Sequence, residues 1–157
     1  KEELRWGPSA SPTLGYELAK AGHRLSRELL RIDGLHPGTY ELMIDDVVIG
    51  RFTDLQLGAK VELQNFRETP QSQQALRVTH LNRARNDEVI RPMRELWSKV
   101  KGLRRKELSE TDFAARCGIL KSEIDLLHAE SKQFEERIYE AAQPVPRRYR
   151  LVRIDEP

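Results

Sequence analysis

Hydrophobic residues follow two different spacings along the chain, and the spacing changes near residue 67. Between Glu28 and Thr53 apolar and polar residues alternate, as in ELLRID (28–33), TYELMID (39–45) and VVIGRFT (47–53). A period of two places successive side chains on opposite faces of a strand, so we expect a three-stranded antiparallel meander. The connections DGLHPG and Asp45-Asp46 have turn composition, and Gly50 is a candidate β-bulge.

Helical spacing replaces this alternation in the second half of the chain. Thr69 predicts an N-cap and Pro70 the first residue of a helix that runs to about Lys101, with Gly102 as its expected end. Pro92 should kink or break this helix, because it lacks a backbone donor and crowds the preceding turn. The apolar stripe of the helix consists of Leu76, Val89, Met93, Leu96 and Val100.

A second long helix is predicted after SETD (109–112), which has the spacing of a capping box, and it must end before Pro144. Its apolar positions advance by steps of four and three, which is a heptad pattern with one polar member. We call this set the seam: Phe113, Cys117, Leu120, Ile124, Leu127, Ser131, Phe134, Ile138 and Ala141.

About eight residues separate the two helices, which favours an antiparallel hairpin buried along the seam. The alternative is that the seam binds another protein or a second copy of the chain. The tail RRYRLVRID (147–155) alternates and contains β-branched residues, so we expect a strand that returns to the sheet.

These elements predict an α+β fold, with a small antiparallel β-meander packed with a short helix, followed by a long antiparallel helical hairpin. The short helix is expected from Leu14 to Ser26, where apolar residues recur at helical spacing. The expected divisions are a loop or linker (1–13), the short helix plus meander (14–66), the hairpin (67–143) and a C-terminal tail with a strand (144–157).

Composition narrows the classes of function. Of 157 residues, 38% are hydrophobic and 33% are charged, yet the net charge is only +2, so a general polyanion binder is not indicated. The basic clusters GLRRK (102–106) and PRRYR (146–150) lie among acidic residues and are interpreted as solvated helix ends, with no nucleic-acid partner. No run of about 18 apolar residues is present to span a membrane. The chain begins KEELRW, so we expect it to start within a longer protein.

Asp33 and His36 are the residues most suggestive of catalysis. They have the spacing with which one class of serine esterases places the acid and base of its triad. However, the chain has no Gly-x-Ser-x-Gly elbow, no Gly-Asp-Ser-Leu segment and no glycine-rich oxyanion loop. Asp-Gly and Pro-Gly form turns, so Asp33 and His36 are interpreted as part of a turn, with no catalytic residue assigned.

The other histidines, His23, His80 and His128, lie on three different predicted helices and have no partner at a zinc-ligand spacing. Cys117 is the only cysteine, which excludes an internal disulfide, and it occupies a seam position. We therefore expect no metal site and no cofactor.

Three segments, in order, carry a resemblance to a known family: LLRIDGLHPGTYELMIDDVVIGRF (29–52), TPQSQQALRVTHLNRARNDEVIRPMRELW (69–97) and IYEAAQPVPRRYRLV (138–152). Together they resemble the C-terminal region of secreted SGNH (GDSL-type) ester hydrolases of planctomycete-like bacteria, from about Tyr16 to Val152. Asp45-Asp46 departs from the Asp-Gly usual in that family, and AKVELQN (59–65) replaces a Gly-x-Asn-Leu stretch.

The resemblance implies that the flavodoxin-like catalytic domain, with its Gly-Asp-Ser nucleophile, oxyanion residues and Asp-x-x-His pair, belongs upstream of this chain. DGLHPG aligns with a later Gly-Leu-x-Pro-Gly turn of the family, so no catalytic residue transfers. The chain is then expected to be a non-catalytic accessory region of a secreted or periplasmic esterase acting on acyl esters, possibly of carbohydrate, with the missing catalytic domain as its partner. The alternatives are a free-standing helical-hairpin interaction module, which could self-associate through the seam, and a minimal esterase using Asp33 and His36.

Overall fold

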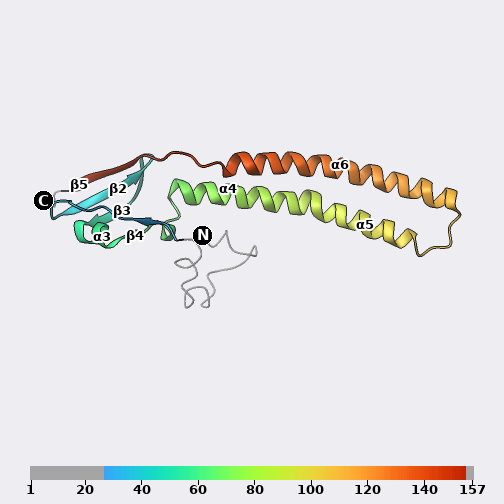
Figure 1. Cartoon of the computed structure of the whole chain (residues 1–157), viewed down its shortest axis with the longest axis horizontal. Coiled ribbons are helices and arrows are strands. Elements are labelled where there is room, and N and C mark those ends of the chain that lie inside the picture. Colours follow the sequence, from blue (N-terminus) through green and yellow to red (C-terminus); the bar gives the residue numbers. More distant parts are fainter. Residues whose placement is uncertain (1–26, 155–157) are drawn as a thin grey trace. The chain divides into compact units, whose positions relative to one another are not determined.

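A computed structural model describes residues 27–154 and confirms the α+β class. The expected linker (1–13) and short helix (Leu14 to Ser26) lie outside the described residues. The chain divides into two compact units, a sheet unit that runs to Arg77 and resumes at Pro144, and a helical unit, Val78–Gln143. Figure 1 shows the order of the elements.

The sheet unit is built on three antiparallel strands in the order β3-β2-β5. They are β2 (Thr39–Ile44), β3 (Val47–Thr53) and β5 (Tyr149–Ile154). The predicted return of the C-terminal strand is confirmed, and β5 pairs with β2 along its whole length, with Leu42 opposite Leu151.

The prediction that residues 28–33 supply the third strand of this meander is wrong. Only β1 (Leu29–Leu30) is extended there, and it pairs with β4 (Val61–Glu62) in a separate small sheet. The six-residue segment between Ile32 and Thr39 is too long for a two-residue hairpin turn, and Pro37 cannot donate to a ladder. Strand β5 occupies the edge of β2 instead.

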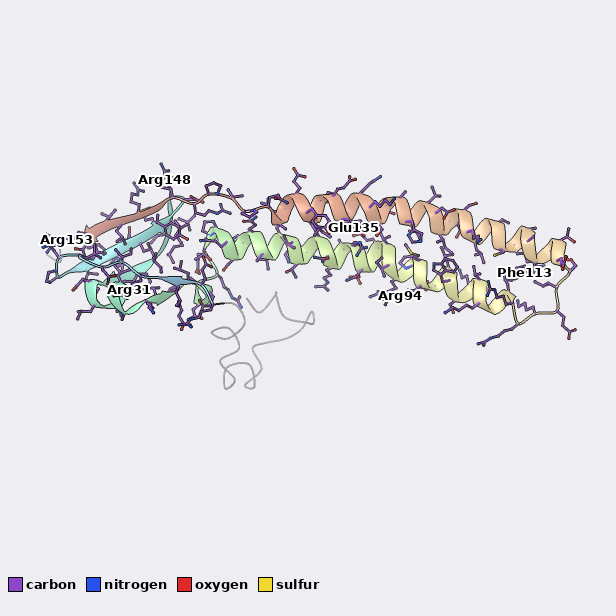
Figure 2. All side chains as sticks on the ribbon, in the orientation of Figure 1. Arg31, Arg94, Phe113, Glu135, Arg148 and Arg153 are labelled. Atoms are coloured by element: carbon purple, nitrogen blue, oxygen red, sulfur yellow. The ribbon has the colours of Figure 1, made fainter. Side chains whose placement is uncertain are left out.

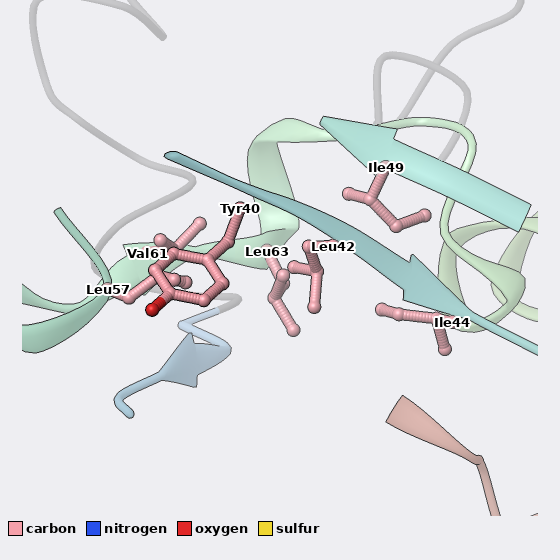
Figure 3. Close-up of a cluster of buried hydrophobic side chains, with 7 residues drawn as sticks. All are labelled: Tyr40, Leu42, Ile44, Ile49, Leu57, Val61 and Leu63. Atoms are coloured by element: carbon pink, nitrogen blue, oxygen red, sulfur yellow. The ribbon is translucent and has the colours of Figure 1, made fainter. Parts of the chain in front are cut away.

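A compact apolar cluster forms the core of the sheet unit (Figure 3). Tyr40, Leu42 and Ile44 lie on one face of β2, as the alternation predicted, and all are buried. Burying an aliphatic side chain of this size contributes about 1.5–3 kcal/mol. The other buried members are Ile49, Leu57, Val61 and Leu63.

Two features of the sheet unit show how short sequence signals act locally. The register of β2 and β3 shifts so that Leu42 faces Gly50 and Met43 faces Val48. A bulge is therefore present, but its extra residue is Ile49, next to the predicted Gly50, and Ile49 is buried in the core. Helix α3 (Asp54–Ala59), which was not predicted, begins with a reciprocal capping box between Thr53 and Gln56. It delivers Leu57 to the core. A single 3₁₀ turn, η2 (Leu63–Asn65), follows β4.

The first arm of the hairpin begins as predicted. Helix α4 (Pro70–Ala84) starts at the proline, and the buried Thr69 hydroxyl accepts from the Ser72 amide at 3.3 Å. Helix α5 (Arg91–Leu103) completes the arm and ends one residue beyond Gly102.

Of the expected kink or break at Pro92, the break does not occur, because helical structure continues from Pro70 to Leu103. The chain passes instead through a π-helical turn, η3 (Arg85–Ile90), in which the Arg91 amide donates to the Asn86 carbonyl, and Pro92 enters the first turn of α5. Pro92 lacks the amide that would donate to the preceding turn, and the wider π-helical turn before it accommodates the proline without a break.

Helix α6 (Glu110–Ala142) spans 33 residues and forms the second arm, alongside α5 (Figure 1). The Ser109 hydroxyl caps it by accepting from the Asp112 amide at 3.1 Å, and the helix ends before Pro144 as predicted. Every seam position is buried or half-buried. The seam packs against Val89, Met93, Leu96 and Val100 of the first arm, which confirms the internal hairpin.

Candidate functional site

Asp33 and His36 lie in the connection between β1 and β2, and both side chains are exposed. The Asp33 carboxylate accepts from Arg31 Nε at 3.0 Å, while the His36 carbonyl accepts from the Tyr40 hydroxyl at 2.8 Å. No hydrogen bond joins Asp33 to His36 in the described chain. Gly34 takes a φ of 78°, which its lack of a side chain permits. The geometry is that of a turn anchored to the sheet by Tyr40.

The remaining candidate ligands and nucleophiles are dispersed. His80 is exposed on α4 and His128 on α6, whereas His23 lies outside the described residues. Cys117 is half-buried at its seam position. Between residues 27 and 154, no three His, Cys, Asp or Glu side chains are arranged to hold a metal ion, and no helix has both the length and the apolar content to cross a membrane.

An ion-pair cluster joins the β2–β3 turn to the start of β5. Asp45 receives Arg147 Nη1 and the Arg148 amide, both at 2.9 Å, and its own amide donates to the Arg148 carbonyl at 3.0 Å. Asp46 receives Arg148 Nη2 at 2.9 Å and Arg150 Nη2 at 3.1 Å. We call these residues, Asp45, Asp46, Arg147, Arg148 and Arg150, the Asp–Arg cluster. Arg148 is labelled in Figure 2.

The Asp–Arg cluster changes the interpretation of the basic segment 146–150. That segment is not a helix end, because it enters β5 and its arginines pair with the turn aspartates. The hydrogen bond from the Arg148 amide, followed by the one from the Arg147 side chain, lowers the pKa of Asp45 from its ordinary value of 3.8. Asp45 is therefore a constitutive anion that holds the turn to the tail.

A second polar group lies beside this cluster. Gln71 Nε2 donates to Glu28 Oε1 at 3.0 Å and to the Tyr149 hydroxyl at 2.6 Å, so residues from α4, β5 and the start of the described chain meet at one amide. Burial, and then the negative charge of Glu28, raise the pKa of Tyr149 above 10.0. Tyr149 stays a neutral phenol and is no candidate base.

The helical unit has its own polar contact inside the hairpin. Arg85, in the π-helical turn, donates from Nε to the hydroxyl of Ser131 at 3.0 Å and pairs through Nη2 with Glu135, which is labelled in Figure 2. Ser131 is the polar member of the seam and is buried. The contact satisfies that hydroxyl and aligns the two arms at one register.

Taken together, these groups join segments that are distant in the sequence. Among the described residues no serine hydroxyl is hydrogen-bonded to a histidine. The hydrogen-bonded serine hydroxyls contact a residue of their own helix cap, a backbone carbonyl or Arg85. The chemistry of nucleophilic ester cleavage requires such a pair and an oxyanion site. The described geometry supplies structural ion pairs and apolar contacts.

The Asp–Arg cluster could not be predicted from the sequence, because its partners are about a hundred residues apart. The only signals were two consecutive aspartates in a tight turn and a run of arginines in the tail. Neither signal identifies the other as its partner. The register of β5 against β2 is what brings the arginines to the two aspartates.

None of the protein-family models matches this chain, and no curated protein matches it. Among solved structures, the chain is similar to BT4096, a gut microbial diltiazem-metabolizing enzyme, with 25% sequence identity and a TM-score of 0.66. The similarity covers 96% of this chain and 39% of that chain. The chain thus spans about two-fifths of the length of that enzyme.

Proposed function

We propose that this chain is a non-catalytic C-terminal accessory region of an SGNH-type ester hydrolase. The observation that carries the proposal is the similarity of nearly the whole chain to 39% of a longer enzyme. The three-segment resemblance to SGNH C-terminal regions supports the choice of family. Asp33 and His36, bonded as a turn, support the assignment of catalysis to another part of such a protein.

In this proposal the sheet unit and the hairpin pack beside an upstream catalytic domain and shape the entrance to its substrate. The parent activity would be hydrolysis of acyl esters, including those of carbohydrates, in a secreted or periplasmic enzyme. The connection between β1 and β2 is anchored to the sheet by the hydrogen bond from the Tyr40 hydroxyl to the His36 carbonyl, and such anchoring suits a positioning role.

A serine-directed reagent tests the proposal directly. The full chain is exposed to a fluorophosphonate and examined by intact-mass analysis, alongside hydrolysis of a short-chain aryl ester. We expect neither a mass increase nor turnover. Stoichiometric labelling with turnover that is lost in His36→Ala would replace the accessory role with a minimal esterase built on Asp33 and His36.

The second candidate function is a free-standing protein interaction module. Exposed apolar side chains on α6, Ile119 and Leu126, favour it. Because the seam packs against α5 of the same chain, an additional partner would bind a different surface of α6. Sedimentation of the unlabelled chain over a wide concentration range distinguishes self-association from a monomeric accessory role.

A further inference from the structure

The C-terminal half of α5 and the turn that follows it carry an excess of positive charge that the chain as a whole does not have. Residues 94–106 contain six basic residues and one acidic residue, whereas the net charge of all 157 residues is +2. Three of these cations share one side of the helix with a tryptophan, because they are spaced by three or four residues. We call this set the basic stripe: Arg94, Trp97, Lys101 and Arg104.

Helical geometry keeps carboxylates away from the basic stripe. At about 100° per residue, the four members lie within an arc of about 80°. Glu95 lies about 160° around the helix from Trp97, and Glu107 follows the helix end, in the connection to α6. Arg94 is labelled on α5 in Figure 2. The stripe is therefore a line of positive charge with one aromatic side chain.

The charges of the basic stripe are exposed and are not neutralised within the described chain. All four members are exposed, and Trp97 is 39% exposed. The arginines of the Asp–Arg cluster pair with carboxylates. In contrast, no side chain among the described residues forms an ion pair or a hydrogen bond with Arg94, Lys101 or Arg104. The helix dipole favours a cation in the last turn, which accounts for Lys101 but not for Arg94 or the exposed indole.

The chemistry of the stripe narrows the kind of anion that it fits. An interfacial helix inserts a wide apolar face into a membrane, whereas Trp97 is the only apolar member of the stripe. Proteins that bind single-stranded nucleic acid stack successive bases on several aromatic side chains, and α5 has one. One indole among cations suits a polymer in which carboxylates alternate with apolar ring faces. Acidic polysaccharides have this chemistry, since the C–H face of a sugar packs on an indole and its carboxylate pairs with guanidinium and ammonium groups.

We propose that the basic stripe binds an acidic polysaccharide, with Trp97 packed on one sugar ring and Arg94, Lys101 and Arg104 paired with carboxylates of neighbouring sugars. At 1.5 Å per residue the stripe is about 15 Å long, so consecutive sugars of one polymer chain can contact it. This inference rests on the accessory role proposed above, because it names the polymer that the region would hold: the carbohydrate whose acyl esters the catalytic domain would cleave.

The test uses the full chain and polygalacturonate, with the neutral polymer dextran beside it. In affinity electrophoresis we expect polygalacturonate in the gel to retard the chain, less so as salt increases, and dextran to have no effect. Loss of two charge pairs in the double variant Arg94→Gln/Lys101→Gln should weaken binding about tenfold. Trp97→Ala should weaken it about fivefold through the lost ring contact.

The matched control is the double variant Arg77→Gln/Lys132→Gln, which removes two charges from exposed positions outside the basic stripe. It should bind polygalacturonate like the unmodified chain, and circular dichroism checks that all variants keep their helices. No retardation, or equal losses in the two double variants, overturns the proposal. Tighter binding to oligothymidylate or to phosphatidylglycerol vesicles than to polygalacturonate also overturns it, and assigns the stripe to nucleic acid or to a membrane.

Failure of this proposal can be distinguished from failure of the accessory role. Absence of polygalacturonate binding, with no fluorophosphonate labelling, removes the polysaccharide site and leaves the accessory role standing. Fluorophosphonate labelling with turnover removes the accessory role, whatever the stripe binds.

Discussion

Asp45 and Asp46 show how single residues can hold a strained turn without glycine. Their φ angles are 48° and 67°, in the left-handed region where an ordinary side chain costs about 1–2 kcal/mol. Aspartate tolerates this region better than most residues, and both carboxylates bind arginines that arrive with β5. The turn and the tail therefore stabilise each other.

The lowered pKa of Asp45 predicts an acid-dependent loss of stability. A carboxyl whose pKa is lower in the folded than in the unfolded chain stabilises the fold above pH 3.8, and this contribution disappears as the pH falls through the folded-state pKa. We expect Asp45→Asn to be less stable than the unmodified chain at pH 7, with the gap closing below pH 3.8. Thermal unfolding across this pH range measures the difference in stability between the two proteins. A difference that persists at pH 2 would contradict the prediction.

At Asp46 the backbone conformation should matter more than the charge. Its ion pairs with Arg148 and Arg150 are exposed, and exposed pairs contribute about 0–1 kcal/mol. Asp46→Gly loses them but removes the left-handed strain, so it should change the unfolding free energy by less than about 1 kcal/mol. Asp46→Val, branched at Cβ, should destabilise by more than about 2 kcal/mol. Urea unfolding gives the unfolding free energies of Asp46→Gly and Asp46→Val. Equal losses of stability in the two variants would contradict the prediction that the backbone conformation matters more than the charge.

At the scale of elements, the hairpin combines a regular seam with one irregular turn. The π-helical turn accommodates Pro92 and also carries Arg85, which reaches Ser131 and Glu135 on α6. The same local widening that avoids a break thus supplies the polar contact that aligns the arms. Apolar packing along the seam provides most of the stabilisation, because isolated helices gain little from propensity.

Phe134 provides a quantitative test of the seam. It is 6% exposed, and truncation of a buried phenylalanine typically costs about 3–5 kcal/mol through lost burial and the cavity left behind. Phe134→Ala should therefore destabilise the helical unit by about 3 kcal/mol. Tyr139→Ala, on the same helix but exposed, should cost less than about 0.5 kcal/mol. Chemical unfolding monitored by helicity compares the stability of Phe134→Ala with that of Tyr139→Ala. Similar losses of stability in the two variants would mean that the seam is not the main source of stability.

At the scale of the molecule, the sheet unit is assembled from both ends of the described chain, with the helical unit inserted between Arg77 and Pro144. The last strand is therefore essential to a core that begins more than a hundred residues earlier. Leu151 packs against the cluster of Tyr40, Leu42 and Ile44. Such long-range closure makes the sheet unit dependent on its C-terminal tail.

Truncation after Gln143 should separate the two units. It removes β5 and all arginines of the Asp–Arg cluster, which leaves β2 and β3 as a two-stranded hairpin of marginal stability. Hydrogen exchange should show loss of amide protection across β2, while the α5–α6 pair keeps its protection. Retained protection in β2 would show that β5 is dispensable for the sheet.

The periodic elements were accessible from the sequence because their signals are local. The Thr69 and Ser109 caps, the seam from Phe113 to Ala141 and the alternating face of β2 depend on residues a few positions apart. Helix α3 was missed, although Thr53 and Gln56 have the capping-box spacing that marks its start. A six-residue helix has too short an apolar pattern to be detected by periodicity.

Long-range pairing was decided by tertiary structure. Alternation in residues 28–33 and in the tail is equally compatible with the edge of β2. In the structure that edge is taken by β5, and Leu151 packs onto the cluster that contains Leu42. The partners of Asp45, and the contact of Arg85 with Ser131, likewise depend on which distant backbone positions become neighbours. Sequence periodicity specifies the face a residue occupies, whereas its partner depends on how separate faces compete for burial.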